Sequence, residues 1–385
     1  MATIYPFSIY TSQGQVYPSS GDNSLMLNLD YLGYMPSVIS QQLEGIKTLL
    51  ELKTFNLPES EHPIVIFPDI SKIDISDWNK SKLNLYGQEN TVFPNPSSIN
   101  LDEFGEIDVS CFHNCNALKN IEFTGSCPID FGEAVVPTGY CYLYDTFSRC
   151  FSLETIKGLD LSDYSAICYK DAFDDCWNLT SFEDCFFPTS LYGDNSNGFR
   201  GCRSLTALPQ IRNTTNVTNF SYTFDNVEIS SYSNTFDLSN CTNTAGMFCY
   251  NKNLTTMPTI TNMTENITDI SSMYEAVGEW VWDSYRDSGQ EYTPTQSVTV
   301  KFANGANAYN AFRNCCLLNS IIVDTNNMPI NGFIHPTWVY REWLKQLTIY
   351  VPSAKVQDWI TYLKAECEGD SELEAIVENM VQPIS

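Results

Sequence analysis

One phrase, Phe-x-x-Cys-x-x-Leu, recurs along the sequence and limits the folds that this chain can adopt. Five copies match it in full, and a sixth has Asn in place of Cys. Two degenerate copies, at Phe224 and Tyr274, keep only the aromatic position. The eight aromatic anchors are separated by 35, 26, 26, 25, 24, 26 and 38 residues. A period near 25 is typical of leucine-rich-repeat solenoids, which are built from stacked coils.

The repeat predicts a β-rich solenoid of about eight coils, each with a short strand, a turn and a return segment. The inward Phe and Leu are buried only when one coil stacks on the next. The Cys or Asn slot suits a small side chain, because an amide satisfies backbone groups and a thiol packs as a weakly polar hydrophobe. We expect structural cysteines and some distortion in the two degenerate coils. The predicted repeat core comprises Phe112, Cys115, Leu118, Phe147, Cys150, Leu153, Phe173, Cys176, Leu179, Phe199, Cys202, Leu205, Phe248, Asn251, Leu254, Phe312, Cys315 and Leu318.

The phrases Asn240–Phe248 and Asn266–Tyr274, each ending in Met and an aromatic residue, resemble BspA-type leucine-rich repeats. The stretch Leu347–Pro352 and the ending Val381–Ile384 are similar to the tail that closes many such arrays. The resemblance covers about residues 105–385 and implies a repeat solenoid. It also implies recognition and not catalysis, because members of this family are chiefly surface adhesion and binding proteins, with related arrays in phage-encoded proteins.

We expect three regions. Residues 1–104 lack the repeat and predict a small α+β cap or docking region, with a helix over 37–53 and strands over 64–67 and 73–76. The solenoid occupies 105–334. Residues 335–385 predict a closing cap: a short helix over 337–346, a strand over 347–351, a helix beginning at Ser353, and another whose capping box is Ser371 and Glu374.

Charge and hydropathy exclude several functions. The net charge of −26 repels nucleic-acid phosphates and anionic lipid surfaces, so we expect no nucleic-acid partner. No apolar run approaches the roughly 20 residues that span a bilayer, and the N-terminus has no export-signal pattern. We therefore expect no membrane insertion, and free thiols in place of disulfides. These features favour a bacteriophage virion component made in the host cytoplasm. A cell-surface adhesin whose leader is missing and a cytosolic interaction scaffold are the alternatives.

Catalytic and cofactor motifs are missing from the sequence. Nucleophile elbows, phosphate-binding loops, zinc-protease helices and dinucleotide fingerprints do not occur. The run Asp194–Gly198 resembles a calcium loop, but its Gly stands one position early and the twelfth position is Leu205 where a bidentate Glu is required. The sequence therefore predicts no enzyme, no metal and no cofactor.

Aromatic residues in a predicted polar loop are the binding candidates. The insertion near 278–300 carries Trp280, Trp282 and Tyr285, rings that suit stacking on sugars or anchoring a protein partner. Trp280 also occupies a degenerate repeat position and is equally compatible with the core. We expect docking to a particle through the N-terminal region, a host-surface glycan or protein as ligand, and a homo-oligomer or assembly-bound chain.

Overall fold

The computed structural model describes residues 112–115, 118–125 and 136–384, together with the backbone of six short strands nearer the N-terminus. The predicted helix over 37–53 and the predicted strand over 73–76 lie outside the described residues. The helices are α2 (Glu279–Asp287), α3 (Arg341–Leu344), α4 (Val356–Lys364) and α5 (Ser371–Met380). The strands are β1 (Phe7–Tyr10), β2 (Val16–Tyr17), β3 (Ile66–Pro68), β4 (Ser97–Asn100), β5 (Ile107–Asp108), β6 (Asn120–Thr124), β7 (Ile129–Asp130), β8 (Tyr140–Tyr142), β9 (Thr155–Lys157), β10 (Ala166–Cys168), β11 (Ser181–Glu183), β12 (Ser190–Asp194), β13 (Asn213–Asn219), β14 (Thr235–Asp237), β15 (Thr259–Thr261), β16 (Gln296–Val300), β17 (Leu318–Val323), β18 (Thr348–Val351) and β19 (Val381–Pro383).

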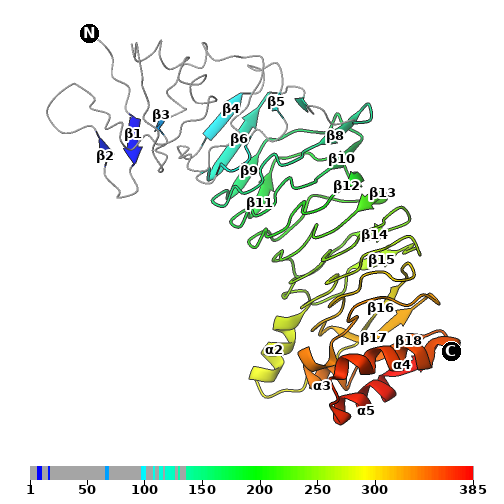
Figure 1. The fold of residues 1–385 in the computed structure, drawn as a ribbon. Helices are drawn as coiled ribbons and strands as arrows, with labels where there is room; N and C mark the ends of the chain where they lie inside the picture. Colours follow the sequence, from blue (N-terminus) through cyan, green and yellow to red (C-terminus); the bar gives the residue numbers. More distant parts are fainter. Residues whose placement is uncertain are drawn as a thin grey trace, which may run out of the picture.

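Strands β4 to β19 pair in parallel along an elongated solenoid (Figure 1), which confirms the predicted architecture of about eight coils. One four-stranded sheet has the order β11-β9-β6-β4, and a second has the order β13-β12-β10-β8. A third sheet, β16-β17-β18-β19, closes the C-terminal end, and β14 pairs with β15 before it. Strands β1, β2 and β3 form a separate antiparallel sheet.

The hydrogen-bond ladder between coils continues through the turn that holds each aromatic anchor. In one coil, Phe173 N donates to Gly198 O at 2.9 Å, and Asp175 N donates to Arg200 O at 2.7 Å. Residues two before and two after the anchor adopt positive φ, which Asn, Asp and Gly tolerate best. These positions are Asn114, Asp145, Arg149, Asp171, Asp175, Asn197, Gly201, Tyr222, Asn226, Gly246, Tyr250, Ser272, Ala276, Asn310 and Asn314.

The aromatic anchors form a continuous stack along the solenoid axis. Adjacent rings from Phe112 to Phe312 are stacked, with centroid separations from 5.1 Å to 6.1 Å. The rings of the degenerate coils, Phe224 and Tyr274, keep their places in this stack, so the expected distortion does not reach it. All eighteen residues of the predicted repeat core are buried.

Three Cys residues of the repeat, Cys150, Cys176 and Cys202, and the Asn of the repeat bind the same backbone group, the anchor carbonyl of the preceding coil. Cys176 Sγ donates to Phe147 O at 3.0 Å, in the preceding coil, and Cys202 Sγ donates to Phe173 O at 3.2 Å. Asn251 Nδ2 donates to Phe224 O at 2.6 Å, so the amide takes the place of the thiol. The Phe147 carbonyl also accepts from Cys150 N at 3.2 Å within its own coil, so the thiol is its second donor. A thiol and an amide can each act as this donor, which explains why the two residue types alternate in the sequence.

We predict that Cys176→Val destabilises the protein by about 1 kcal/mol, because the carbonyl of Phe147 loses its thiol donor. Val already fills the equivalent position at Val227, where it is buried, so its size suits the slot. Urea unfolding measures the difference. The reverse substitution, Val227→Cys, is the matched control and should leave stability equal or higher. A Cys176→Val protein as stable as the wild type would contradict this role for the thiol.

At five of the eight anchors, the residue that follows the ring is charged: Asp174, Arg200, Asp225, Glu275 and Arg313. Arg200 binds Asp174 through two hydrogen bonds of 2.6 Å and 2.8 Å, and Arg313 binds Glu275 at 2.9 Å. Asp225 stands between Arg200 and Cys249, and its buried Oδ1 has no hydrogen-bond partner. Burial raises the pKa of Asp225 to about 7, against the opposing effects of Arg200 and the Cys249 thiol.

Asp225 should make the protein less stable as pH rises. Its folded pKa lies above its unfolded value, so between about pH 4 and 7 the folded state holds more protons and the free energy of unfolding falls. We predict that Asp225→Asn flattens this slope and increases stability at pH 8 by on the order of 2 kcal/mol. Unfolding curves at pH 5 and pH 8 test it, and an equal effect of the substitution at both would contradict the assignment.

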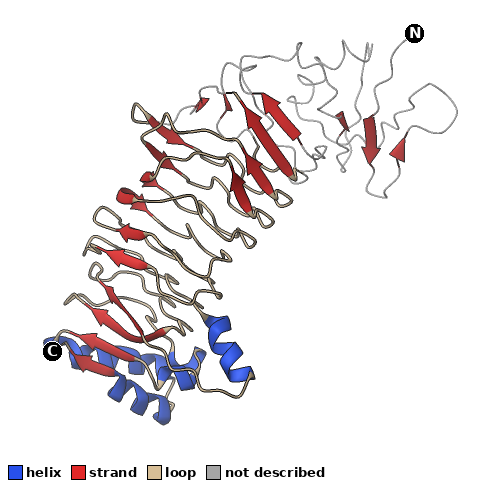
Figure 2. Ribbon diagram, turned by 180° about the vertical axis from the view of Figure 1, so that it is seen from behind, coloured by secondary structure: helices blue, strands red, loops and turns tan. Residues whose placement is uncertain are grey.

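The C-terminal cap covers the last coil with helices, as Figure 1 and Figure 2 show for α4 and α5. Trp359 of α4 is fully buried, and its ring meets Phe333 edge-on at 5.0 Å. Phe333 in turn contacts the last anchor ring, Phe312, at 4.8 Å in a tilted arrangement. The predicted start of α5 needs correction, because Asp370 is the cap and not Ser371. The Asp370 side chain accepts hydrogen bonds from the backbone N–H groups of Glu372 and Leu373.

Candidate functional site

The aromatic residues of the 278–300 insertion lie on a helix, α2, in place of the expected polar loop. Glu279 fixes this helix to its neighbours: its carboxylate pairs with Lys252 at 2.7 Å and accepts from Tyr340 Oη at 3.1 Å. Trp282 is buried, with only 7% of its surface exposed, and stacks on Tyr340 at 6.3 Å. It is therefore part of the packing that holds α2 to the solenoid.

Trp280 and Tyr285 remain at the surface, 49% and 39% exposed. The Tyr285 ring meets Tyr292 at 5.1 Å, so a part of it is already covered. The structure places Trp280 outside the core, which decides between the two interpretations of its repeat position. Of the three predicted binding residues, these two have exposed rings.

A different region, which the sequence did not single out, carries the more enclosed candidate site. Strand β11 is the outermost strand of its sheet, and residues 203–212 of the next coil form no strand. Pro209 lies in this segment, and a proline has no N–H to donate to a neighbouring strand. The coils remain adjacent, because Arg212 N donates to Thr189 O at 2.7 Å beyond the gap. The sheet is therefore interrupted while the solenoid around it is intact.

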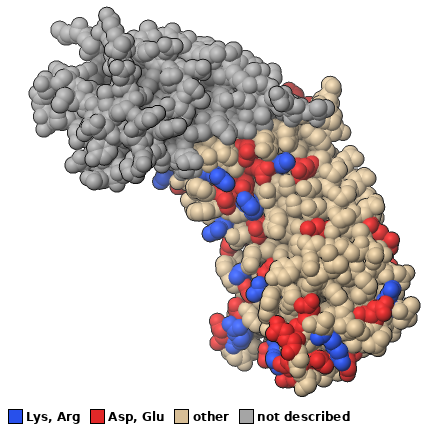
Figure 3. Space-filling model, in the orientation of Figure 1, with Lys and Arg blue, Asp and Glu red and all other residues tan. Residues whose placement is uncertain are grey.

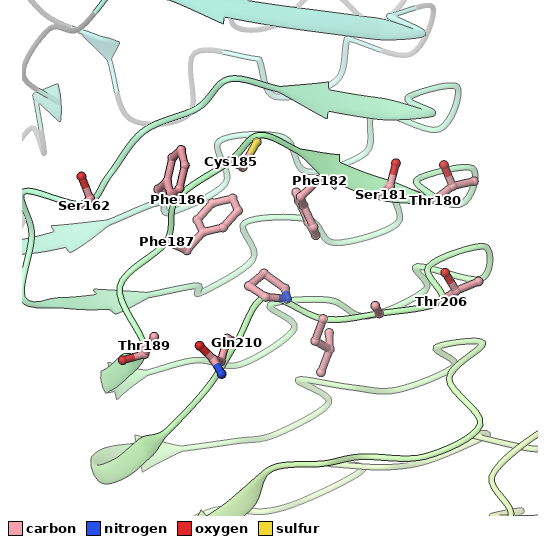
Figure 4. Close-up of a pocket in the computed structure, with 13 residues that line it drawn as sticks. Ser162, Thr180, Ser181, Phe182, Cys185, Phe186, Phe187, Thr189, Thr206 and Gln210 are labelled. Carbon is pink, nitrogen blue, oxygen red and sulfur yellow. The ribbon is translucent and has the colours of Figure 1, made fainter.

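Two neighbouring cavities open at this interruption, with volumes of about 450 Å³ and 550 Å³. They share the segment Thr206–Gln210. We call the combined depression the trough; it is lined by Ser162 and by residues from 180–189, 206–212 and 229–234. Figure 4 shows the first cavity, with Phe182 and Phe187 on one side and Thr206 and Gln210 of the next coil on the other.

One wall of the trough is aromatic. Phe182 and Phe187 meet edge to face at 5.3 Å, and Phe182 also contacts the anchor ring of Phe173 at 5.2 Å. Phe186 is 58% exposed, yet its backbone is fixed: its N donates to Leu159 O at 2.9 Å, and its O accepts from Leu161 N at 2.8 Å. An exposed ring on a rigid backbone binds a ligand with little loss of conformational entropy.

The opposite wall is polar and neutral, apart from one cation. Thr206 and Gln210 are exposed there, and Ser231 and Ser233 follow in the next coil. Arg212 Nη2 donates to Gln210 Oε1 at 3.1 Å, which orients the amide and leaves its NH₂ group for a ligand. Among the residues that line the trough, Arg212 is the one charged side chain.

The trough offers little acid–base or nucleophilic chemistry. Its lining includes no His, Asp, Glu or Lys. Cys185 is the lining thiol, and burial raises its pKa to about 11, so it stays protonated at neutral pH. Over the parts of the chain that the structure describes, no three His, Cys, Asp or Glu side chains gather as a metal site. The arrangement suits binding by contact and hydrogen bonding.

Comparisons with family models, curated proteins and solved structures give no match to this chain. No helix within the described residues has the length and apolar character needed to span a bilayer.

We predict opposite outcomes for the two tryptophans of α2. Trp282→Ala should destabilise the protein by about 3 kcal/mol, because it leaves a cavity beside Tyr340. Trp280→Ala should change stability by less than about 0.5 kcal/mol, because the ring is exposed. Urea unfolding, with hydrogen exchange across α2, measures both. Equal losses of stability in the two variants would show that α2 packs on the solenoid through a different face.

Proposed function

We propose that this chain is a non-catalytic recognition protein that holds an extended ligand in the trough. The composition of the trough carries the proposal: exposed and half-buried phenyl rings line it together with hydroxyl and amide groups, without an acid–base pair. Concave sites with apolar walls and a few fixed polar groups are typical of ligand binding. The two cavities continue from one coil to the next, which favours a chain-like ligand over a compact one.

The surface chemistry supports selective contact. Acidic residues outnumber basic ones by 46 to 20, which opposes unspecific attachment to polyanions. Charged side chains on the face in Figure 3 are scattered, and much of the coil surface between them carries neither sign. A trough whose lining holds one charged side chain, Arg212, is a place within an acidic protein where an uncharged ligand can bind without an electrostatic penalty.

Within this proposal, the protein is a bacteriophage surface component that presents its solenoid to a host cell. The resemblance of the repeats to BspA-type binding proteins supports this location. The twelve described cysteines are all free, which is typical of proteins that fold in a reducing cytoplasm. A bacterial adhesin and a cytosolic scaffold are the alternatives.

Density-gradient fractionation of the native source, with mass spectrometry of each fraction, tests the location. Co-sedimentation with particles at a fixed stoichiometry is the expected result. Recovery in the envelope fraction would favour the adhesin, and recovery in the soluble fraction alone would favour the scaffold.

The role of the trough has its own test. We predict that the purified protein binds cell envelopes from the native source, and that Phe186→Ala weakens this binding at least tenfold, because it removes the exposed ring. Trp280→Ala is the matched control, since it removes an exposed ring away from the trough, and it should bind as the wild type does. Wild-type binding by Phe186→Ala, or no envelope binding at all, would overturn the proposal.

A further inference from the structure

We infer that the ligand of the trough is a neutral oligosaccharide of at least two sugar units, with one unit against Phe186 and the next beside Gln210. The inference rests on the proposed function and adds the chemical class of the ligand. Three features of the trough support it: its aromatic wall, its polar wall of hydroxyl and amide groups, and the fixed spacing of the coils on either side of it.

The aromatic wall of the trough is complementary to the apolar face of a sugar. A pyranose has an apolar face of C–H groups, which packs on an aromatic ring, and a rim of hydroxyl groups. Phe182 and Phe187 meet edge to face, so the contact between them covers part of both rings. Phe186 is the ring whose surface is most exposed, and its main-chain bonds to Leu159 and Leu161 fix its position. It can therefore serve as the stacking platform.

The polar wall of the trough is complementary to the hydroxyl groups at the rim of a sugar. Hydroxyl and amide groups both donate and accept hydrogen bonds, as sugar hydroxyls do, so either partner can supply the proton. Thr206, Gln210 and Ser231 present such groups on successive coils. Arg212 holds the oxygen of Gln210, and the amide NH₂ remains as an oriented donor between the two cavities.

The spacing of the coils disfavours an added peptide strand at β11. The coils on either side of the gap are tied at one end by Phe173 N to Gly198 O, at 2.9 Å, and at the other by Arg212 N to Thr189 O, at 2.7 Å. An inserted strand would need about 4.8 Å on each side of it, which these bonds do not allow. The ligand must therefore lie on the outer surface of the gap, where side chains make the contacts.

The carboxylates beside the trough oppose binding of a polyanion. Glu183 and Asp184 stand exposed between Phe182 and Cys185, beside the aromatic wall, and Arg212 is the one cation in the lining. Sulfated or sialylated chains would meet these carboxylates, whereas an uncharged chain would not. Coils repeat at about 4.8 Å. That is close to the length of one sugar unit in an extended chain, so successive units can meet equivalent positions on successive coils.

Titration of the full chain with neutral gluco-, manno-, xylo- and galacto-oligosaccharides of one to six units, followed by calorimetry, tests the inference. We expect at least one series to bind, with affinity that rises from one unit to several. Phe186→Ala and Gln210→Ala should each lower that affinity at least tenfold, while Tyr285→Ala on α2 should not change it. A sialylated or sulfated chain of equal length should bind at least tenfold more weakly. Circular dichroism confirms that each variant is folded.

The outcomes separate this inference from the proposed function. If no neutral oligosaccharide binds while envelope binding still depends on Phe186, the ligand is of another class and the recognition function stands. Competition for the envelopes by an unstructured peptide would identify that class as polypeptide and overturn the inference. Oligosaccharide binding that survives both Phe186→Ala and Gln210→Ala would place the sugar site elsewhere and overturn it equally.

Discussion

The structure depends on one constraint: each coil must carry its aromatic anchor in register with the anchors of its neighbours. In several coils a side-chain donor reinforces this register by reaching the anchor carbonyl of the preceding coil, as the thiol of Cys176 and the amide of Asn251 do. Since the donor also stands three residues after its own ring, one contact fixes the rotation of a coil and its distance from its neighbour. The ring stack, the parallel sheets and the ion pairs beside the anchors all follow from coils held in this register.

The register explains how much of the fold could be predicted from the sequence. Phe, Cys and Leu recur because each coil has the same environment, so their spacing indicated the coils and their buried faces. The repeat pattern does not indicate every stacked ring. Tyr274 keeps its place in the stack although the Cys and Leu of its repeat are replaced. Packing of the rings therefore keeps the stack intact where Val227 or Val277 stands in place of the donor.

The features that the sequence did not indicate are those that occur in one place in the solenoid and are not part of the repeat. Helix α2 is an insertion, and Trp282 is covered by the rings of Tyr292 and of Tyr340, which stands 58 residues later in the chain. The trough arises where Pro209 interrupts a sheet, and its walls come from segments of three coils. The Leu208-Pro209 pair at a strand position was the available signal. Whether such a pair leaves a gap in the sheet depends on the neighbouring coil, which the sequence of a single repeat does not specify.

Coils held by identical bonds also make the length of this molecule adjustable. The ladder at Phe173 is the same kind of ladder as at Phe147 and Phe199, so a coil duplicated or removed between the trough and α2 would leave both neighbours with the partners that they need. Such a change would move these two surface features apart or together in steps of one coil spacing, with each left unchanged. A change in the number of repeats during evolution can therefore alter the distance between two contact points while the structure of each stays the same.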